Sequence, residues 1–165
     1  MPPKIKVNFN LNGLQNLENQ AKQLNRYVAK VGILGDKNFR SDSKQSNAEI
    51  GATHEFGSFS KNIPRRSFLR DPFFLFKREF GEKIRAIILK NSGKNGEIPN
   101  AKKIFDLIGA HGVALVQKSF ATGGFGKWKP LKQSTIDQKG SSAILIDTAQ
   151  LRKSITFKTD TKSKQ

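Results

Sequence analysis

The chain has 165 residues and a formal net charge of +17, from 30 basic and 13 acidic side chains. This length suits one domain with its own core, and a charge of this size attracts nucleic acid, acidic protein surfaces or anionic lipid. The absence of cysteine excludes disulfides, thiolate metal sites and cysteine nucleophiles.

The first elements alternate between strand and helix patterns. Residues 4–9 alternate polar and apolar side chains, which predicts a half-buried strand. Asn12 and Gly13 open a predicted helix, and residues 30–34 predict a second strand. The helix has one apolar stripe, made of Leu14, Leu17, Ala21, Leu24 and Val28.

The middle of the chain predicts helices separated by polar loops, which we expect to be flexible at 35–47, 57–63 and 91–100. A short helix over 48–57 ends at a glycine. Asp71 and Pro72 predict a helix start, with the aspartate as N-cap and the proline in the first turn. The helical spacing then continues through Phe73, Phe76, Phe80, Ile84, Ile87 and Ile88.

The last part begins with a long predicted helix at 101–120. Gly109 and Gly112, three residues apart on it, let a neighbouring element come close. The remaining predictions are, in order, a flexible glycine-rich loop near 121–127, a short helix or turn at 131–139, a strand at 143–147, a turn or short helix at 148–152, a strand at 154–158 and a polar tail from about 159.

These elements predict an α+β fold, in which a small antiparallel or mixed sheet packs against two or three helices with long polar loops. We expect one domain over residues 1–165. The N-terminus lacks the apolar core of a signal peptide, and no stretch approaches 18 apolar residues. No membrane contact is therefore expected.

His54 and Glu55 raise the question of a zinc protease motif. That motif needs a second histidine four residues later on the same helix, but Ser58 stands there and Gly57 interrupts the helix. The other histidine is His111, so the expected reading is a polar His54 near a turn and a partly buried helical His111. No metal site is expected.

Other catalytic patterns also fail. A phosphate-binding loop at 123–128 would need glycine at Ala121 and serine or threonine at Trp128. No nucleophile elbow is present, and the acidic residues are scattered. We expect no enzyme, no catalytic residues and no cofactor.

Three arginines follow within six residues: Arg65, Arg66 and Arg70. Arginine forms planar, bidentate bonds with phosphate or carboxylate, so with Phe68 this cluster could bind a nucleic-acid backbone. The alternative is a solvated loop with ion pairs to Glu55 and Asp71. The sequence carries no helix-turn-helix, zinc-finger or aromatic RNA-binding signature.

The order of motifs from about 28 to 158 resembles a tail-completion family of tailed bacteriophages and prophages. The first half reads Val31-Gly32-Ile33, then Glu55-Phe56-Gly57, then Ile63-Pro64-Arg65-Arg66-Ser67-Phe68-Leu69-Arg70. Ser67 stands where the family usually has proline.

The second half resembles the ending of the same family and of Mu G-like virion morphogenesis proteins. It reads Ile108-Gly109, then Trp128, Pro130, Leu131, Thr135, Lys139, Leu145, Ile146, Asp147, Thr148, Gln150, Leu151, Arg152, Ser154 and Ile155. Ala149 stands where glycine is usual. A local reading has Asp147 capping a turn and Arg152 pairing with it.

The resemblance implies a structural virion protein at the head–tail junction or tail end, made in the host bacterial cytoplasm and assembled into a ring, commonly of six. Implied partners are copies of itself and neck, connector or tail-tube proteins. The candidate assembly interface comprises Glu55, Phe56, Arg65, Arg66, Phe68, Arg70, Phe125, Lys127, Trp128 and Arg152. The basic charge would meet an acidic ring or, transiently, genomic DNA in the channel. The alternative is a basic, prophage-encoded DNA-binding protein.

Overall fold

The computed structural model describes residues 12–40, 43–93 and 97–162, so the strand predicted at 4–9 lies outside the described residues. The α+β architecture is confirmed. The elements are α1 (Asn12–Asn25), β1 (Tyr27–Ile33), the 3-10 helix η1 (Gly35–Asn38), α2 (Asn47–Phe56), α3 (Arg70–Leu75), α4 (Lys77–Lys90), α5 (Ala101–Ala121), α6 (Gln133–Lys139), α7 (Gln150–Lys153) and β2 (Ile155–Thr161).

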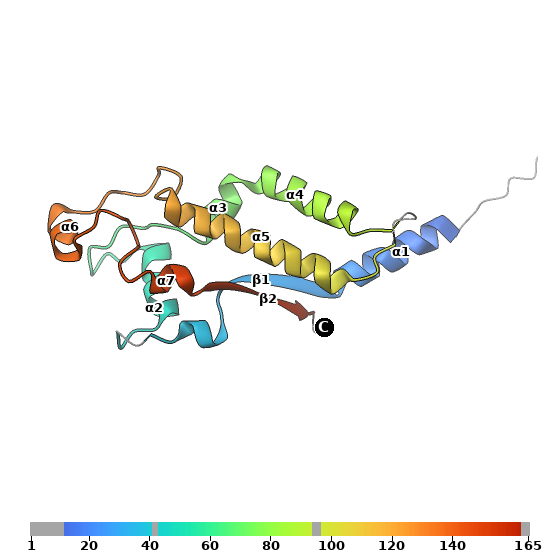
Figure 1. Ribbon diagram of the computed structural model, residues 1–165, viewed down its shortest axis with the longest axis horizontal. Helices are drawn as coiled ribbons and strands as arrows, with labels where there is room; N and C mark the ends of the chain where they lie inside the picture. Colours follow the sequence, from blue (N-terminus) through green and yellow to red (C-terminus); the bar gives the residue numbers. More distant parts are fainter. Residues whose placement is uncertain (1–11, 41–42, 94–96, 163–165) are drawn as a thin grey trace, which may run out of the picture.

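The long helix α5 is the centre of the molecule (Figure 1). The strands β1 and β2 pair antiparallel, with Ile33 opposite Ile155 and Tyr27 opposite Thr161, and α5 packs on them. Helices α3 and α4 pack against α5 as well. In Figure 1, α1 extends from one end of this body, whereas α2, α6 and α7 gather at the other end.

The main core lies towards the end that holds α2 and α7. It consists of Phe68, Val116, Phe120, Trp128, Leu151 and Ile155. The Phe120 ring meets Phe68 at 5.0 Å and the edge of Trp128 at 5.9 Å between centroids. Such aromatic pairs add to the stabilisation from burial alone. The core therefore joins four segments that are far apart in the sequence.

The close approach predicted at the two glycines of α5 is confirmed. A Cβ added at Gly109 would lie 2.4 Å from Cδ2 of Phe157, and one at Gly112 would lie 2.9 Å from Cγ2 of Val31. Both neighbours belong to the strands, so the glycines let side chains of the sheet pack directly against the backbone of α5.

The helix predicted from Asp71 onward is divided in two. The backbone of Phe76 leaves helical geometry, with φ −110° and ψ 30°, and this separates α3 from α4. The prediction of Asp71 as N-cap was wrong, because α3 begins at Arg70 with Leu69 as its N-cap. The carboxylate of Asp71 instead pairs with Arg65 at 2.5 Å. The donors at this helix start bond to another carboxylate, described below.

The strand predicted at 143–147 was also wrong. These residues form turns, and Leu145 has a φ of +58°, which is incompatible with extended backbone. The Nζ of Lys139 donates to the carbonyls of Ala143 and Ile146 at 2.8 and 2.7 Å. One lysine thus satisfies carbonyls that a strand would have given to a neighbouring strand.

Smaller differences concern the ends of elements. Val28, predicted in the stripe of the first helix, belongs to β1, which begins at Tyr27. The polar loop predicted at 35–47 contains η1 and ends early, because Ser46 caps α2. The predicted tail from 159 is strand up to Thr161.

Ala149 adopts the left-handed conformation that glycine prefers, with φ 59° and ψ 8°. Because a Cβ makes this conformation costly by roughly 1 kcal/mol, Ala149→Gly is expected to raise the free energy of unfolding by about that amount. Thermal denaturation should show a rise in Tm of about 3 °C. Ala143→Gly, at a neighbouring turn without positive φ, is the control. A Tm for Ala149→Gly that is equal to or lower than that of the unchanged protein would contradict the claim that Ala149 is strained.

Candidate functional site

Helix α2 carries His54 and Glu55 in its last turn, and both of its ends are well defined. At its start, the Ser46 N–H donates to Oε2 of Glu49 at 2.8 Å, and the Glu49 N–H donates to Oγ of Ser46 at 3.3 Å. This capping box satisfies two donors of the first turn. At its end, Gly57 has a φ of +80°, which turns the chain back beside the helix.

Glu55 is the organising residue of the arginine loop, and only 4% of it is exposed. Its Oε1 accepts hydrogen bonds from Ser67 Oγ at 2.6 Å, from the Arg70 N–H at 3.1 Å and from Arg70 Nε at 3.0 Å. Its Oε2 accepts the N–H groups of Phe68 and Leu69, both at 2.9 Å. One carboxylate therefore binds the backbone donors where the chain enters α3.

The same contacts determine the ionisation of Glu55. Burial alone raises the pKa of a carboxyl group, but hydrogen bonds from Ser67, the Leu69 N–H and Arg70 outweigh burial and hold the pKa of Glu55 below its usual value. Glu55 is therefore a charged structural anchor at neutral pH.

The three arginines of the loop have different surroundings. Arg70 pairs with Glu55 and lies 4.4 Å above the Phe56 ring, and Arg65 pairs with Asp71, so both predicted ion pairs are confirmed. Arg66 is only 6% exposed. Its Nε donates to the carbonyl of Lys129 at 3.0 Å and its Nη2 to that of Pro130 at 3.3 Å. Arg66 thus joins two loops and is not solvated.

The glycine-rich loop positions Trp128 against the segment that Glu55 and Arg66 hold. Residues 123–126 all have positive φ values. Trp128 packs on Gly124, where a Cβ would lie 2.1 Å from the indole nitrogen. That nitrogen donates to the carbonyl of Ser67 at 3.3 Å, and the Phe125 ring contacts Phe76 at 4.6 Å.

The ten predicted interface residues divide by exposure. Four are buried, and the structure corrects the prediction for these, because side chains inside the subunit leave no surface for a partner: Glu55, Arg66, Phe68 and Trp128. Four are exposed and two are half-buried, and for these a contact with a partner stays a prediction: Phe56, Arg65, Arg70 and Lys127, then Phe125 and Arg152. Arg152 donates from Nε to Gln117 at 2.7 Å and does not pair with Asp147 as predicted.

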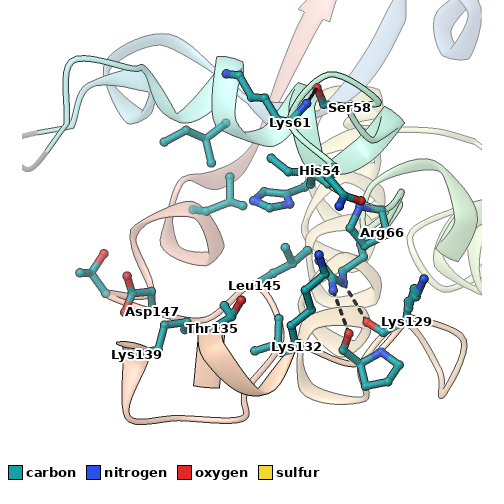
Figure 2. Close-up of a pocket in the computed structure, with 18 of the residues that line it drawn as sticks. His54, Ser58, Lys61, Arg66, Lys129, Lys132, Thr135, Lys139, Leu145 and Asp147 are labelled. Atoms are coloured by element: carbon teal, nitrogen blue, oxygen red, sulfur yellow. Dashed lines mark hydrogen bonds between the residues drawn. The ribbon is translucent and has the colours of Figure 1, made fainter. Parts of the chain in front are cut away.

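A cavity that the sequence reasoning missed lies beside this framework (Figure 2). Its volume is about 1190 Å³, and its walls come from α2, the loop after it, the segment before α6 and residues 145–151. The six cationic residues that line it are Arg40, Lys61, Arg66, Lys129, Lys132 and Lys139. The recurring lysines in 127–132 were the one sequence feature that could have indicated a basic site here.

His54 is not simply near a turn, because its ring lies in this cavity (Figure 2). Burial, with the positive charges of Arg66 and Lys139, lowers the pKa of His54 to about 4. Its buried Nδ1 has no hydrogen-bond partner among the described residues. His54 is therefore a neutral imidazole at physiological pH.

The predicted partly buried His111 is confirmed on α5, where its ring stacks on Phe80 at 5.7 Å. Within residues 12–40, 43–93 and 97–162, no three histidine, aspartate or glutamate side chains gather as metal ligands would. None of the helices in these ranges combines the length and apolar character that a membrane crossing needs.

Comparisons of the chain with known protein families, curated proteins and solved structures found no match.

Proposed function

We propose that this chain is a structural protein of a tailed-phage or prophage particle, a ring subunit at the head–tail junction or tail end. The observation that carries the proposal is the distribution of exposed apolar side chains. Among the described residues, the large ones are Leu14, Leu17, Phe39, Phe56, Phe59, Phe74, Leu89 and Leu107. Contiguous exposed apolar groups are typical of interaction surfaces, and Leu14 and Leu17, three residues apart on α1, lie on one face of that helix.

Several of these side chains lie at the two ends of the molecule, whereas Phe74 and Leu107 are on α3 and α5. Leu14 and Leu17 are on α1, which extends from one end, and Phe56 and Phe59 are at the α2 end (Figure 1). No described side chain of α1 is fully buried, although most helices owe their stability to packing. Different surfaces at opposite ends suit head-to-tail contacts, which close into rings.

The motif residues behind the resemblance support the same proposal in another way. Glu55, Arg66 and Trp128 form one hydrogen-bonded framework inside the subunit. Proteins that act by assembly need such a rigid subunit with exposed contacts. The proposed partners are copies of this chain, in a ring expected to have six subunits, and neck, connector or tail-tube proteins.

The test is deletion of the gene in the parent phage or lysogen, followed by electron microscopy of the lysate. Filled heads with separate or overlong tails are expected. Complementation with the Leu14→Gln, Leu17→Gln double variant should fail, whereas a Gln15→Ala, Asn19→Ala control on the same helix should restore whole particles. Normal numbers of infectious particles after deletion would refute the proposal.

The net charge of +17 favours one alternative, a prophage-encoded DNA-binding protein. Such a protein would bind duplex DNA without sequence preference, and its affinity would fall steeply with salt because counterions are released. Measuring DNA affinity at several salt concentrations separates this function from assembly.

A further inference from the structure

The cavity beside His54 combines two kinds of wall. Six cationic residues and one carboxylate, that of Asp147, line it, which gives a formal excess of five positive charges. The apolar part of its wall consists of Ile50, Phe59, Ile63, Pro64, Pro130, Leu131, Leu145, Ala149 and Leu151. A ligand that matches both must carry negative charge and apolar groups.

Two of the cations are already engaged in building the walls. Arg66 holds the carbonyls of Lys129 and Pro130, and Lys139 holds those of Ala143 and Ile146. By contrast, no carboxylate among the described residues lies within 4.0 Å of the ammonium of Lys61, Lys129 or Lys132. These lysines retain donors for a ligand.

Figure 2 shows how these groups are arranged. The His54 ring lies near the centre of the view, Arg66 acts on it through its charge, Lys132 is drawn below it and Lys61 is at the upper edge. Within the part of the chain that the structure describes, Nδ1 of His54 is the buried ring nitrogen that has no protein partner. Lys132, which lines the cavity without a carboxylate partner among the described residues, is therefore one of the cations available to a ligand, and the His54 ring lies in the same wall.

We propose that this cavity binds an acidic, apolar peptide segment of a partner protein, with a carboxylate bonded to Lys132 and leucine-like side chains against Leu131, Leu145 and Leu151. Its volume, about 1190 Å³, accommodates several residues. The inference deepens the proposed function and rests on it only for the source of the segment, another protein of the particle.

The wall favours a peptide over nucleic acid. Single strands bind where bases stack on aromatic side chains along a basic groove. Here Phe59 is the one phenylalanine among the described residues that line the cavity and is fully exposed, whereas the rest of the apolar wall is leucine, isoleucine, proline and alanine. Apolar walls of this kind take aliphatic side chains, and the lysines then choose acidic partners.

The test uses a fluorescein-labelled peptide of alternating glutamate and leucine, and a matched peptide with glutamine replacing glutamate. Fluorescence anisotropy at 0.15 M salt should give at least tenfold tighter binding of the glutamate peptide. Lys132→Gln should weaken that binding about tenfold. Lys83→Gln, the same charge change on α4 away from the cavity, should change it less than twofold.

An NMR readout makes the result independent of the variants. The chain has two histidines, so adding the glutamate peptide should shift the imidazole signals of His54 and leave those of His111 unchanged. Equal weakening in both lysine variants, or displacement of the peptide by a short single-stranded oligonucleotide, would overturn the proposal. Specific peptide binding by a chain whose gene deletion leaves particles whole would refute the assembly function and leave this site standing.

Discussion

Replacing Glu55 by glutamine is expected to lower the free energy of unfolding by about 3 kcal/mol, because the carboxylate accepts five hydrogen bonds and an amide cannot accept all of them. An amide oxygen in the place of Oε1 could still accept three of them. The amide NH₂ would face N–H donors of Phe68 and Leu69, which would be left unsatisfied inside the protein. Urea denaturation followed by far-UV circular dichroism measures the change.

Two controls separate the contributions. Arg70→Ala removes only the exposed ion pair and the contact with Phe56, so a loss below about 1 kcal/mol is expected. Glu49→Gln weakens an exposed capping box, with a similarly small effect. If Glu55→Gln costs no more than Arg70→Ala, the backbone bonds to the carboxylate are not what holds the loop.

The parts of the fold that were predictable from the sequence depend on local signals. Helices α1, α2 and α5 show apolar periodicity, and the glycine after α2 signals its end. The strands β1 and β2, which were both predicted, pair with each other although they lie near opposite ends of the described chain. Residues 154–158 were predicted from their alternation, whereas the pairing of the two strands was not predicted.

The failures come from contacts between distant segments. Residues 143–147 are a short apolar run, and such a run can form a strand or an irregular segment packed on the core. Here it forms turns, because Lys139 donates hydrogen bonds to two of its carbonyls. Asp71 was predicted as the N-cap because it directly precedes Pro72. The backbone N–H of Arg70 instead donates to Glu55, which lies much earlier in the chain, so no local sequence pattern predicts this bond.

The errors in predicting the candidate site have the same cause, which is contact between distant segments. Arginine is seldom buried, so Arg66 was expected at the surface, and only the carbonyls of residues 129 and 130 explain its burial. The cavity needs walls from separate segments, and sequence alone does not bring them together. What the sequence did indicate was the pairing of Glu55 and Asp71 with arginines.

The second large prediction concerns acid. His54 has a folded-state pKa of about 4, against about 6.5 in an unfolded chain. Between these values the unfolded chain binds a proton that the folded protein does not, so stability falls as the pH falls through this window. The full contribution is present above about pH 7.5, and about 2 kcal/mol should be lost between that pH and pH 5.

The two histidines again provide the control. His54→Gln should flatten the stability profile between about pH 7 and 5, because its side chain does not titrate. Burial and Lys83 lower the pKa of His111 as well, so His111→Gln should flatten the profile slightly, and clearly less than His54→Gln does. The stability that Glu55 contributes is lost only as the pH falls through its ordinary pKa, near 4.5, so the upper part of the window reports on the histidines.

Measured by urea denaturation at half-unit steps of pH, the profile also tests the cavity. The charges that hold His54 neutral include Arg66 and Lys139, which build the walls that would receive an acidic segment. A bound carboxylate would offset those charges and raise the pKa of His54. Less stability should therefore be lost on acidification when the glutamate peptide is present, so the midpoint of the acid transition should move to lower pH, and the glutamine peptide should leave it in place.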